Sequence, residues 1–167
     1  GLGVRSSDAH CEDCEPGQYS AVDAETSCKP CAKGTATNSS KSITCQDCAS
    51  GWYASSTRQR ACKLCASGRA ATVTRSASCT DCAAGQYQPL EGQMKCEACA
   101  AGTHGEDTAR NVTCAACPQG KWAGGGQVAC VSCDAGRAGS SLGVRSSDAH
   151  CEDCAPGQYL SLIHISE

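Results

Sequence analysis

The sequence has few of the large apolar side chains from which a hydrophobic core is built. It contains no Phe, one Met and two Trp in 167 residues, and aromatic residues make up 4% of the chain. The hydrophobic share of 40% is mostly Ala and Cys. A chain of this length normally buries one extended core, but this one lacks the material for it. The fold must therefore be held locally, by cross-links or by metal.

Two further absences limit the function. Basic residues do not predominate, since 14 Lys and Arg face 17 Asp and Glu, for a net charge of −3. Nucleic-acid-binding domains usually carry a basic surface. No run reaches the roughly 18 apolar residues of a membrane span. We therefore expect neither a nucleic-acid partner nor membrane insertion within this chain.

Cysteine, in contrast, is abundant and regularly spaced. There are 18 cysteines, a share typical of disulfide scaffolds. They form nine Cys-x-x-Cys pairs, which begin at Cys11, Cys28, Cys45, Cys62, Cys79, Cys96, Cys114, Cys130 and Cys151. The first six pairs follow one another at steps of 17 residues, and the next three steps are 18, 16 and 21. A fixed period of this kind indicates a repeat architecture.

Each pair is followed by a glycine, three residues after its second cysteine. These are Gly17, Gly34, Gly51, Gly68, Gly85, Gly102, Gly120, Gly136 and Gly157. A glycine at a fixed offset predicts a backbone position with positive φ or a close approach of two chain segments.

The residue two positions after each glycine alternates between large and small. The occupants run Tyr19, Ala36, Tyr53, Ala70, Tyr87, His104, Trp122, Ala138 and Tyr159. The underlying unit is therefore about 34 residues with four cysteines. We expect the rings to be buried, each covering the space left by a small residue in the next unit. An exposed aromatic ladder for sugars or a protein partner is the alternative.

The segments between cysteines are polar and lack helical periodicity, so they predict short strands and turns. The longest, residues 134–150, contains a copy of residues 2–10, and the copy continues through Cys154. Because of this duplication, and because the chain starts at Gly1 without Met, we expect residues 1–159 to be a fragment of a longer array. Residues 160–167 break every pattern, and we expect them to be a non-native tail, the translation of a sequencing adapter.

The repeat limits how the cysteines can pair as disulfides, although their number alone does not. In a sequential scheme, the second cysteine of each pair bonds the first cysteine of the next. An interlocked scheme, with Cys11–Cys28 and Cys14–Cys31, would leave one of the nine pairs without a partner. We expect the sequential scheme, which leaves Cys11 and Cys154 over. Its bonds are Cys14–Cys28, Cys31–Cys45, Cys48–Cys62, Cys65–Cys79, Cys82–Cys96, Cys99–Cys114, Cys117–Cys130 and Cys133–Cys151.

Two other roles for the cysteines are weaker alternatives. Two successive Cys-x-x-Cys pairs could supply four thiolates to zinc, with a spacing close to that of zinc ribbons. Redox catalysis needs a low-pKa cysteine at a helix N-terminus, a context that nine similar pairs in loops do not provide. The sequence has no Cys-x-x-Cys-His and hence no attached c-type haem. We expect no cofactor and no metal.

Two asparagines favour the secretory route, where disulfides form. Asn38-Ser39-Ser40 and Asn111-Val112-Thr113 are both acceptor sequences for N-glycosylation. The four histidines form no constellation with Ser, Asp or Glu that would suggest catalysis. Glu12-Asp13 lacks the spaced acids of a calcium loop, and we expect both to be solvated.

The pattern Cys-x-x-Cys-x-x-Gly-x-Tyr, followed about 13 residues later by the next pair, resembles the ephrin-receptor-like cysteine-rich repeats. It is more distantly similar to the cysteine-rich modules of tumour-necrosis-factor receptors and to Cys-x-x-Cys surface proteins of protists. The resemblance runs from Cys11 to Tyr159 and is most specific at residues 14–19, 82–87 and 154–159. It implies an ectodomain segment without catalytic residues.

These observations together predict a small disulfide-rich repeat protein, an elongated rod of short β-strands and coil with little or no helix. We expect it to act outside the cell as a stalk, spacer or adhesion module of a secreted or surface protein, and not as an enzyme. A receptor-type module with an unknown protein or glycan ligand is one alternative, and an intracellular zinc-thiolate protein is another.

Overall fold

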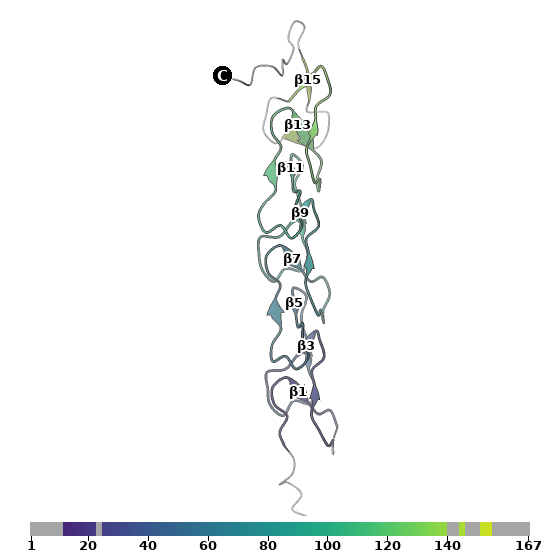
Figure 1. Ribbon diagram of the computed structural model, residues 1–167, viewed down its shortest axis with the longest axis vertical. Coiled ribbons are helices and arrows are strands. Elements are labelled where there is room, and N and C mark those ends of the chain that lie inside the picture. Colours follow the sequence, from purple (N-terminus) through teal and green to yellow (C-terminus); the bar gives the residue numbers. More distant parts are fainter. Residues whose placement is uncertain (1–11, 23–24, 140–143, 146–150, 155–167) are drawn as a thin grey trace, which may run out of the picture. The chain divides into compact units, whose positions relative to one another are not determined.

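The computed structural model describes residues 12–22, 25–139, 144–145 and 151–154 (Figure 1). These residues form short strands joined by turns, with no helix among them. The expected small disulfide-rich repeat fold is therefore confirmed. The strands are β1 (Gln18–Tyr19), β2 (Lys29–Pro30), β3 (Thr35–Ala36), β4 (Gln46–Asp47), β5 (Trp52–Tyr53), β6 (Lys63–Leu64), β7 (Arg69–Ala70), β8 (Thr80–Asp81), β9 (Gln86–Tyr87), β10 (Glu97–Ala98), β11 (Thr103–His104), β12 (Ala115–Ala116), β13 (Lys121–Ala123), β14 (Val131–Ser132), β15 (Arg137–Ala138), β16 (Val144–Arg145) and β17 (Glu152–Asp153).

Each repeat is one miniature antiparallel hairpin. Its first strand directly follows the glycine, and its second strand is the x-x of the next Cys-x-x-Cys pair, so that Gln18 lies opposite Pro30 and Tyr19 opposite Lys29. The same register recurs from β3–β4 to β11–β12. The spacing of the cysteines therefore determines where the strands lie.

The glycines adopt the left-handed backbone that their fixed offset predicts. All eight in the described part of the chain have φ between 74° and 88°, while Gly157 lies outside the described residues. A Cβ on Gly34 would lie 2.1 Å from the carbonyl oxygen of Arg75, so this position also requires the absence of a side chain. The sequence pattern predicted a positive φ or a close approach of two chain segments, and Gly34 shows both.

Backbone hydrogen bonds join each repeat to the next. The amide of Gly17 donates to the carbonyl of Thr37 at 2.7 Å, and that of Gly34 donates to Ala54 at 2.9 Å. The same bond recurs from Gly51, Gly68, Gly85, Gly102 and Gly120. These bonds stack the hairpins, and they satisfy amide groups that a two-residue strand leaves without partners.

The core consists of cysteine and small residues. The second cysteine of most pairs is at most 5% exposed, and the residue three positions after the glycine is often buried as well. This second set includes Ala54, Ala71, Gln88 and Ala123. Its members are mostly small, because their carbonyls accept the bonds from the preceding repeat and the backbones lie close together.

The expectation of buried aromatic rings is wrong. Tyr19, Tyr53, Tyr87 and Trp122 are all half-buried, while Ala36 and Ala70, which occupy the equivalent place in other repeats, are 6% and 5% exposed. A layer of about 17 residues is too thin to enclose a ring. The disulfides fill the centre instead.

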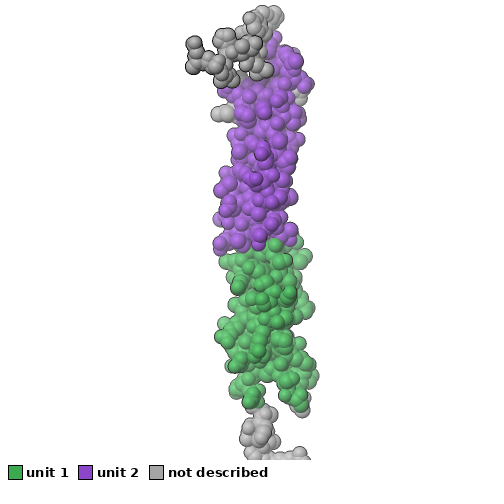
Figure 2. All heavy atoms as spheres, viewed as in Figure 1, with its two compact units in different colours: residues 1–65, 71–79 green, residues 66–70, 80–167 purple. Residues whose placement is uncertain are grey.

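The chain divides into two compact units (Figure 2). Residues 1–65 and 71–79 form the first, which contains β1 to β6, and residues 66–70 and 80–167 form the second, which contains β7 to β17. In the second unit, β13 is three residues long and pairs with β14 on one side and in parallel with β16 on the other. Strand β16 belongs to the long segment 134–150, so this insert adds a strand to the regular hairpin. The expected tail, residues 160–167, lies outside the described residues.

Candidate functional site

Eight disulfides of nearly constant geometry run along the chain. Their Cα–Cα distances are 5.5–5.7 Å, and most close a separation of 14 residues. They are Cys14–Cys28, Cys31–Cys45, Cys48–Cys62, Cys65–Cys79, Cys82–Cys96, Cys99–Cys114, Cys117–Cys130 and Cys133–Cys151. This is the sequential scheme. Cys154 is a free thiol, and Cys11 lies outside the described residues.

Strand geometry explains why a Cys-x-x-Cys pair does not close on itself. Three residues of extended strand span about 10 Å, whereas a disulfide needs Cα atoms within about 6.8 Å of each other. Cys28 and Cys31 flank strand β2, so Cys28 bonds back to Cys14 and Cys31 bonds forward to Cys45. Each pair thus links two successive loops.

A possible metal-binding cluster lies in the second unit. The cluster consists of His104, Cys117 and Cys130. Each offers one ligand atom, and the three atoms lie within 4.8 Å of one another. Cysteine binds metals as the thiolate, and in this structure the two sulfurs are joined to each other. The zinc-thiolate alternative requires free thiols, and the sixteen cysteines of the eight bonds do not supply them.

Cations on the first unit are paired with acids from other repeats. Lys41 Nζ lies 3.2 Å from Asp13, and Arg58 and Arg75 lie 3.5 Å and 3.8 Å from Glu15 and Asp47. All of these side chains are more than half exposed. Each pair contributes at most about 1 kcal/mol. Each of these three cations is thus paired with a carboxylate from another repeat.

The sequence did not lead us to expect the positive φ of the residues that carry these cations. Lys41, Arg58, Arg75 and Ala109 have φ of 54–62°, and Gly92 and Gly126 take the same place in other repeats. The place lies four or five residues before the first cysteine of a pair. These positions recur every 17 residues, which is the one signal that the sequence offers. The residues found there share no side-chain chemistry that would mark a positive φ.

Apolar side chains are exposed at the β5–β6 hairpin. Trp52 and Leu64 lie opposite each other across the two strands and are 39% and 42% exposed. A cross-strand pair of this kind stabilises a hairpin, and it also presents a small apolar surface to solvent. Asn38 and Asn111, the two glycosylation candidates, are exposed in their loops.

Two carboxylate contacts shift pKa values at the hairpins. The hydrogen bond from Lys29 and then that from Ser20 lower the pKa of Glu25, and the same contact raises the pKa of Lys29. Desolvation and a hydrogen bond to Glu97, which lies opposite across β9–β10, raise the pKa of Tyr87. Both contacts join side chains within one hairpin.

The fold and its disulfides define a small, cysteine-rich repeat protein built from miniature hairpins. Residues 68–110 match the family model described as tyrosine-protein kinase ephrin type A/B receptor-like. The resemblance to ephrin-receptor-like repeats is thus confirmed, and such a repeat is a non-catalytic type of module. The curated proteins include no match to the chain. In its described part, the chain has no helix with the length and apolar character needed to cross a membrane.

Proposed function

We propose that the chain belongs to the extracellular part of a secreted or cell-surface protein, in which its repeats serve as a spacer or adhesion segment. The observation that carries this proposal is the recurring bond from each repeat glycine to the next repeat, as from Gly17 to Thr37 and from Gly85 to Gly105. Repeats joined by one constant contact can be added in any number. That property suits a spacer, whose length matters more than any single site.

The cysteines and the two asparagines support the extracellular location. Eight disulfides persist in an oxidising compartment and are rare in the cytosol. Asn38 and Asn111 are exposed, so a glycosyltransferase can reach them.

The test of location is a peptide map of residues 1–159 made in a secretory host. We expect the eight sequential disulfides and a glycan on each asparagine, detected as a mass loss after treatment with an N-glycosidase. An Asn38→Gln variant should lose one glycan and keep every disulfide. Free thiols with bound zinc, and no glycan, would overturn the extracellular assignment.

The test of the spacer role is small-angle X-ray scattering from the same oxidised protein. A compact globule of this length has a radius of gyration of about 15 Å. We expect a clearly larger value together with the sharp, dispersed amide spectrum of a folded chain. A radius near that of a globule would contradict a spacer.

A receptor-type module is the second candidate, and the exposed Trp52–Leu64 pair favours it. Apolar anchors at the centre of an interface commonly carry most of the binding energy. We expect such a module to bind a panel of ectodomains or glycans in a way that Trp52→Ser abolishes. The matched control is Trp122→Tyr, since Tyr occupies this place in other repeats. Binding that Trp52→Ser leaves unchanged would remove this candidate.

A further inference from the structure

Two segments of the chain are identical, residues 2–14 (the earlier segment) and residues 142–154 (the later segment). The later segment contains two strands, β16 and β17, and β17 is Glu152–Asp153. Its counterpart in the earlier segment, Glu12–Asp13, is exposed and forms no strand. In each of the other eight Cys-x-x-Cys pairs, the two residues between the cysteines form a strand that pairs with the strand after the preceding glycine. The same sequence thus has a strand partner in one place and lacks it in the other.

Backbone contacts and one disulfide hold the later segment in the second unit. Strand β16 pairs in parallel with β13, and β17 pairs antiparallel with β15. The amide of Cys154 donates to the carbonyl of Gly136 at 2.9 Å, and Cys151 is bonded to Cys133. Because the earlier segment has the same 13 residues, the earlier segment of a second chain can form every one of these contacts.

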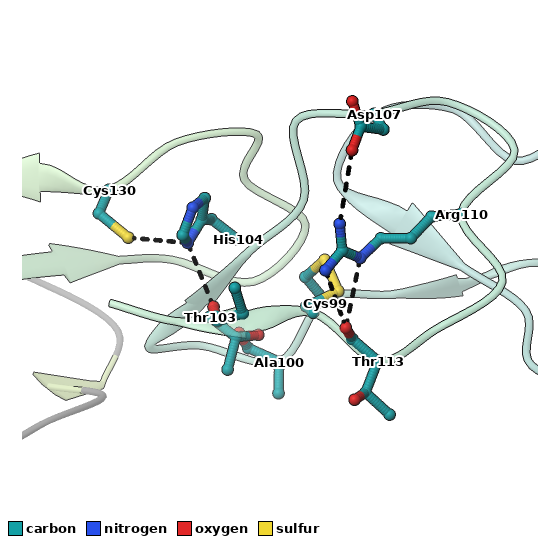
Figure 3. The surroundings of a disulfide bond; sticks show 10 residues. Cys99, Ala100, Thr103, His104, Asp107, Arg110, Thr113 and Cys130 are labelled. Atoms are coloured by element: carbon teal, nitrogen blue, oxygen red, sulfur yellow. Dashed lines mark hydrogen bonds and ion pairs between the residues drawn. A yellow bond between two sulfur atoms is a disulfide. The ribbon is translucent and has the colours of Figure 1, made fainter. Parts of the chain in front are cut away.

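The disulfide of the later segment differs from the other seven in which sulfur is accessible. In those seven bonds the first cysteine is at most 5% exposed and the second is half-buried, whereas here Cys151 is 1% exposed and Cys133 is half-buried. In the neighbouring Cys117–Cys130 bond, the half-buried sulfur of Cys130 lies 3.1 Å from the ring of His104 (Figure 3). Access decides which sulfur an incoming thiol attacks. Attack on Cys133 releases Cys151, and with it the later segment.

We propose that a second copy of the chain places its earlier segment where the later segment lies, so that two chains join head to tail. The thiol of Cys11 of the incoming chain loses its proton and attacks Cys133 Sγ. The bond between Cys133 and Cys151 breaks, and a bond between Cys133 and Cys11 forms. The electron pair of the broken bond stays on Cys151, which takes up a proton. One disulfide replaces another, so no external oxidant is consumed.

Concentration decides between joined and separate chains, because both have the same contacts, as in domain swapping. The later segment remains tethered beside its site, at an effective concentration of the order of 1 mM. Chains at about 10 μM should therefore stay separate, and joined chains should become comparably populated near 1 mM. In the joined form, the disulfides of the second chain continue the sequential scheme of the first.

The experiment mixes folded full-length chains, half of them labelled with ¹⁵N, in a glutathione buffer at about 10 μM and at about 1 mM. Acid quenching, alkylation and peptide mapping without reduction then give the partners of Cys133. We expect a Cys133–Cys11 peptide pair with one labelled half, and its share should rise with concentration. The proposal would be overturned if this pair were absent at about 1 mM, or if both halves always came from the same isotopic pool.

Two proline variants test whether the segment is recognised as a strand. Proline removes a backbone amide and disfavours strand pairing. Val4→Pro changes only the earlier segment and should lower the ratio of Cys133–Cys11 to Cys133–Cys151 about fivefold, the effect of one lost backbone hydrogen bond. Val144→Pro is the matched change in the later segment and should raise the same ratio. A ratio that neither variant alters would show that Cys133 exchanges with any thiol, and it would refute recognition of the segment.

Discussion

At the scale of single residues, each repeat contains two left-handed backbone positions that are treated differently. Glycine occupies the first in every described repeat, where φ is 74–88°. At Gly17, Gly34, Gly68 and Gly85, a carbonyl oxygen from a later repeat also lies where the Cβ would be. The second holds Lys41, Arg58, Arg75 or Ala109, with φ of 54–62°. A side chain in this conformation costs about 1–2 kcal/mol. Glycine at the second position should therefore raise the free energy of unfolding.

Ala109→Gly should raise the stability of the second unit. It removes the strain at a φ of 54°, and after the loss of unfolded-chain entropy we expect a net gain of about 0.5–1 kcal/mol. Urea unfolding of the oxidised chain in a Trp52→Tyr background, followed by the fluorescence of Trp122, measures it. The control is Ala115→Gly in strand β12, which should lower stability. A loss in Ala109→Gly as well would contradict the strain argument.

Gly85→Ala should be costly. Its φ is 80°, and the added Cβ would lie 2.1 Å from the carbonyl oxygen of Gly126. The left-handed backbone alone costs about 1–2 kcal/mol, and the backbone must also shift. In the control Gly125→Ala, the nearest atom is 3.6 Å away. Equal unfolding midpoints for the two variants would show that the close approach does not matter.

Glu25 should titrate below an ordinary glutamate. Lys29 lowers its pKa from 4.5, so the carboxylate contributes stability above that pH and loses it as the pH falls through the folded pKa. Carboxyl ¹³C chemical shifts measured against pH give the value. Lys29→Met should return the pKa toward 4.5, and Ser20→Ala should do so less. No rise in the Lys29→Met chain would mean that the contact does not form in solution.

At the scale of the element, side-chain hydrogen bonds within the hairpin loop contribute to the stability of a repeat. In the β9–β10 hairpin, Gln88 is 4% exposed and its amide ties the loop together. The side chain donates to the carbonyl of Lys95 at 2.9 Å and accepts from the amide of Leu90 at 3.1 Å. Other repeats have Ala54 or Ala71 at this place. An alanine side chain cannot form these two hydrogen bonds.

Gln88→Ala should loosen this loop without disturbing the backbone bonds. Ala fits the place, as it does in other repeats, but the carbonyl of Lys95 and the amide of Leu90 lose a hydrogen-bond partner. The cost is about 1 kcal/mol for each bond. Urea unfolding gives the total effect, and amide hydrogen exchange at Leu90 localises it. Gln93→Ala is the control, because that half-buried side chain donates to the carbonyl of Glu91 at 3.2 Å. Unaltered exchange at Leu90 would argue against the brace.

The hairpins were predictable because they depend on local spacing. The polar segments between the cysteine pairs predicted short strands and turns, and β1 lies in one of them, whereas the position of β2 inside a Cys-x-x-Cys pair was not predicted. The contact of His104 with Cys130 was not predictable, because it depends on how neighbouring repeats pack. The small residues Ala54, Ala71 and Gly105, each three positions after a glycine, carried a signal of close packing that the alternating rings obscured.

The half-burial of Tyr53 and its equivalents shows a second limit. Composition indicates that rings are scarce, and scarcity suggested burial. Burial depends instead on the thickness of the layer, which composition does not give. Most of the buried residues are cysteine and alanine, whose side chains are short enough for a 17-residue hairpin, and Thr35 and Gln88 are buried as well.

At the scale of the whole molecule, stability should behave as a sum over neighbouring repeats. Closing a loop of about 15 residues by a disulfide contributes about 3 kcal/mol. The loss of one bond should therefore affect mainly its own repeat, whereas complete reduction should unfold the chain.

The double variant Cys48→Ser and Cys62→Ser tests this locality. Limited trypsin treatment should cut rapidly after Arg58 and Arg60, which lie in the opened loop, while loops closed by the remaining bonds resist. Peptide mapping of the early products identifies the cut. The variant Cys82→Ser with Cys96→Ser is the matched control and should transfer rapid cleavage to Lys95. Cleavage spread equally over all repeats would show that the array unfolds as one body instead.

The sequential disulfides also determine how the chain responds to a pulling force. Tension passes through each sulfur bridge and the following Cys-x-x-Cys strand, and it bypasses the loop between them. Each repeat can then lengthen only to the 5.5–5.7 Å of the bridge plus about 10 Å of strand. Without the bridges, 17 residues would reach about 60 Å. The bridges of an oxidised array thus limit its extension to about a quarter of that of the reduced chain, even after its hydrogen bonds have broken.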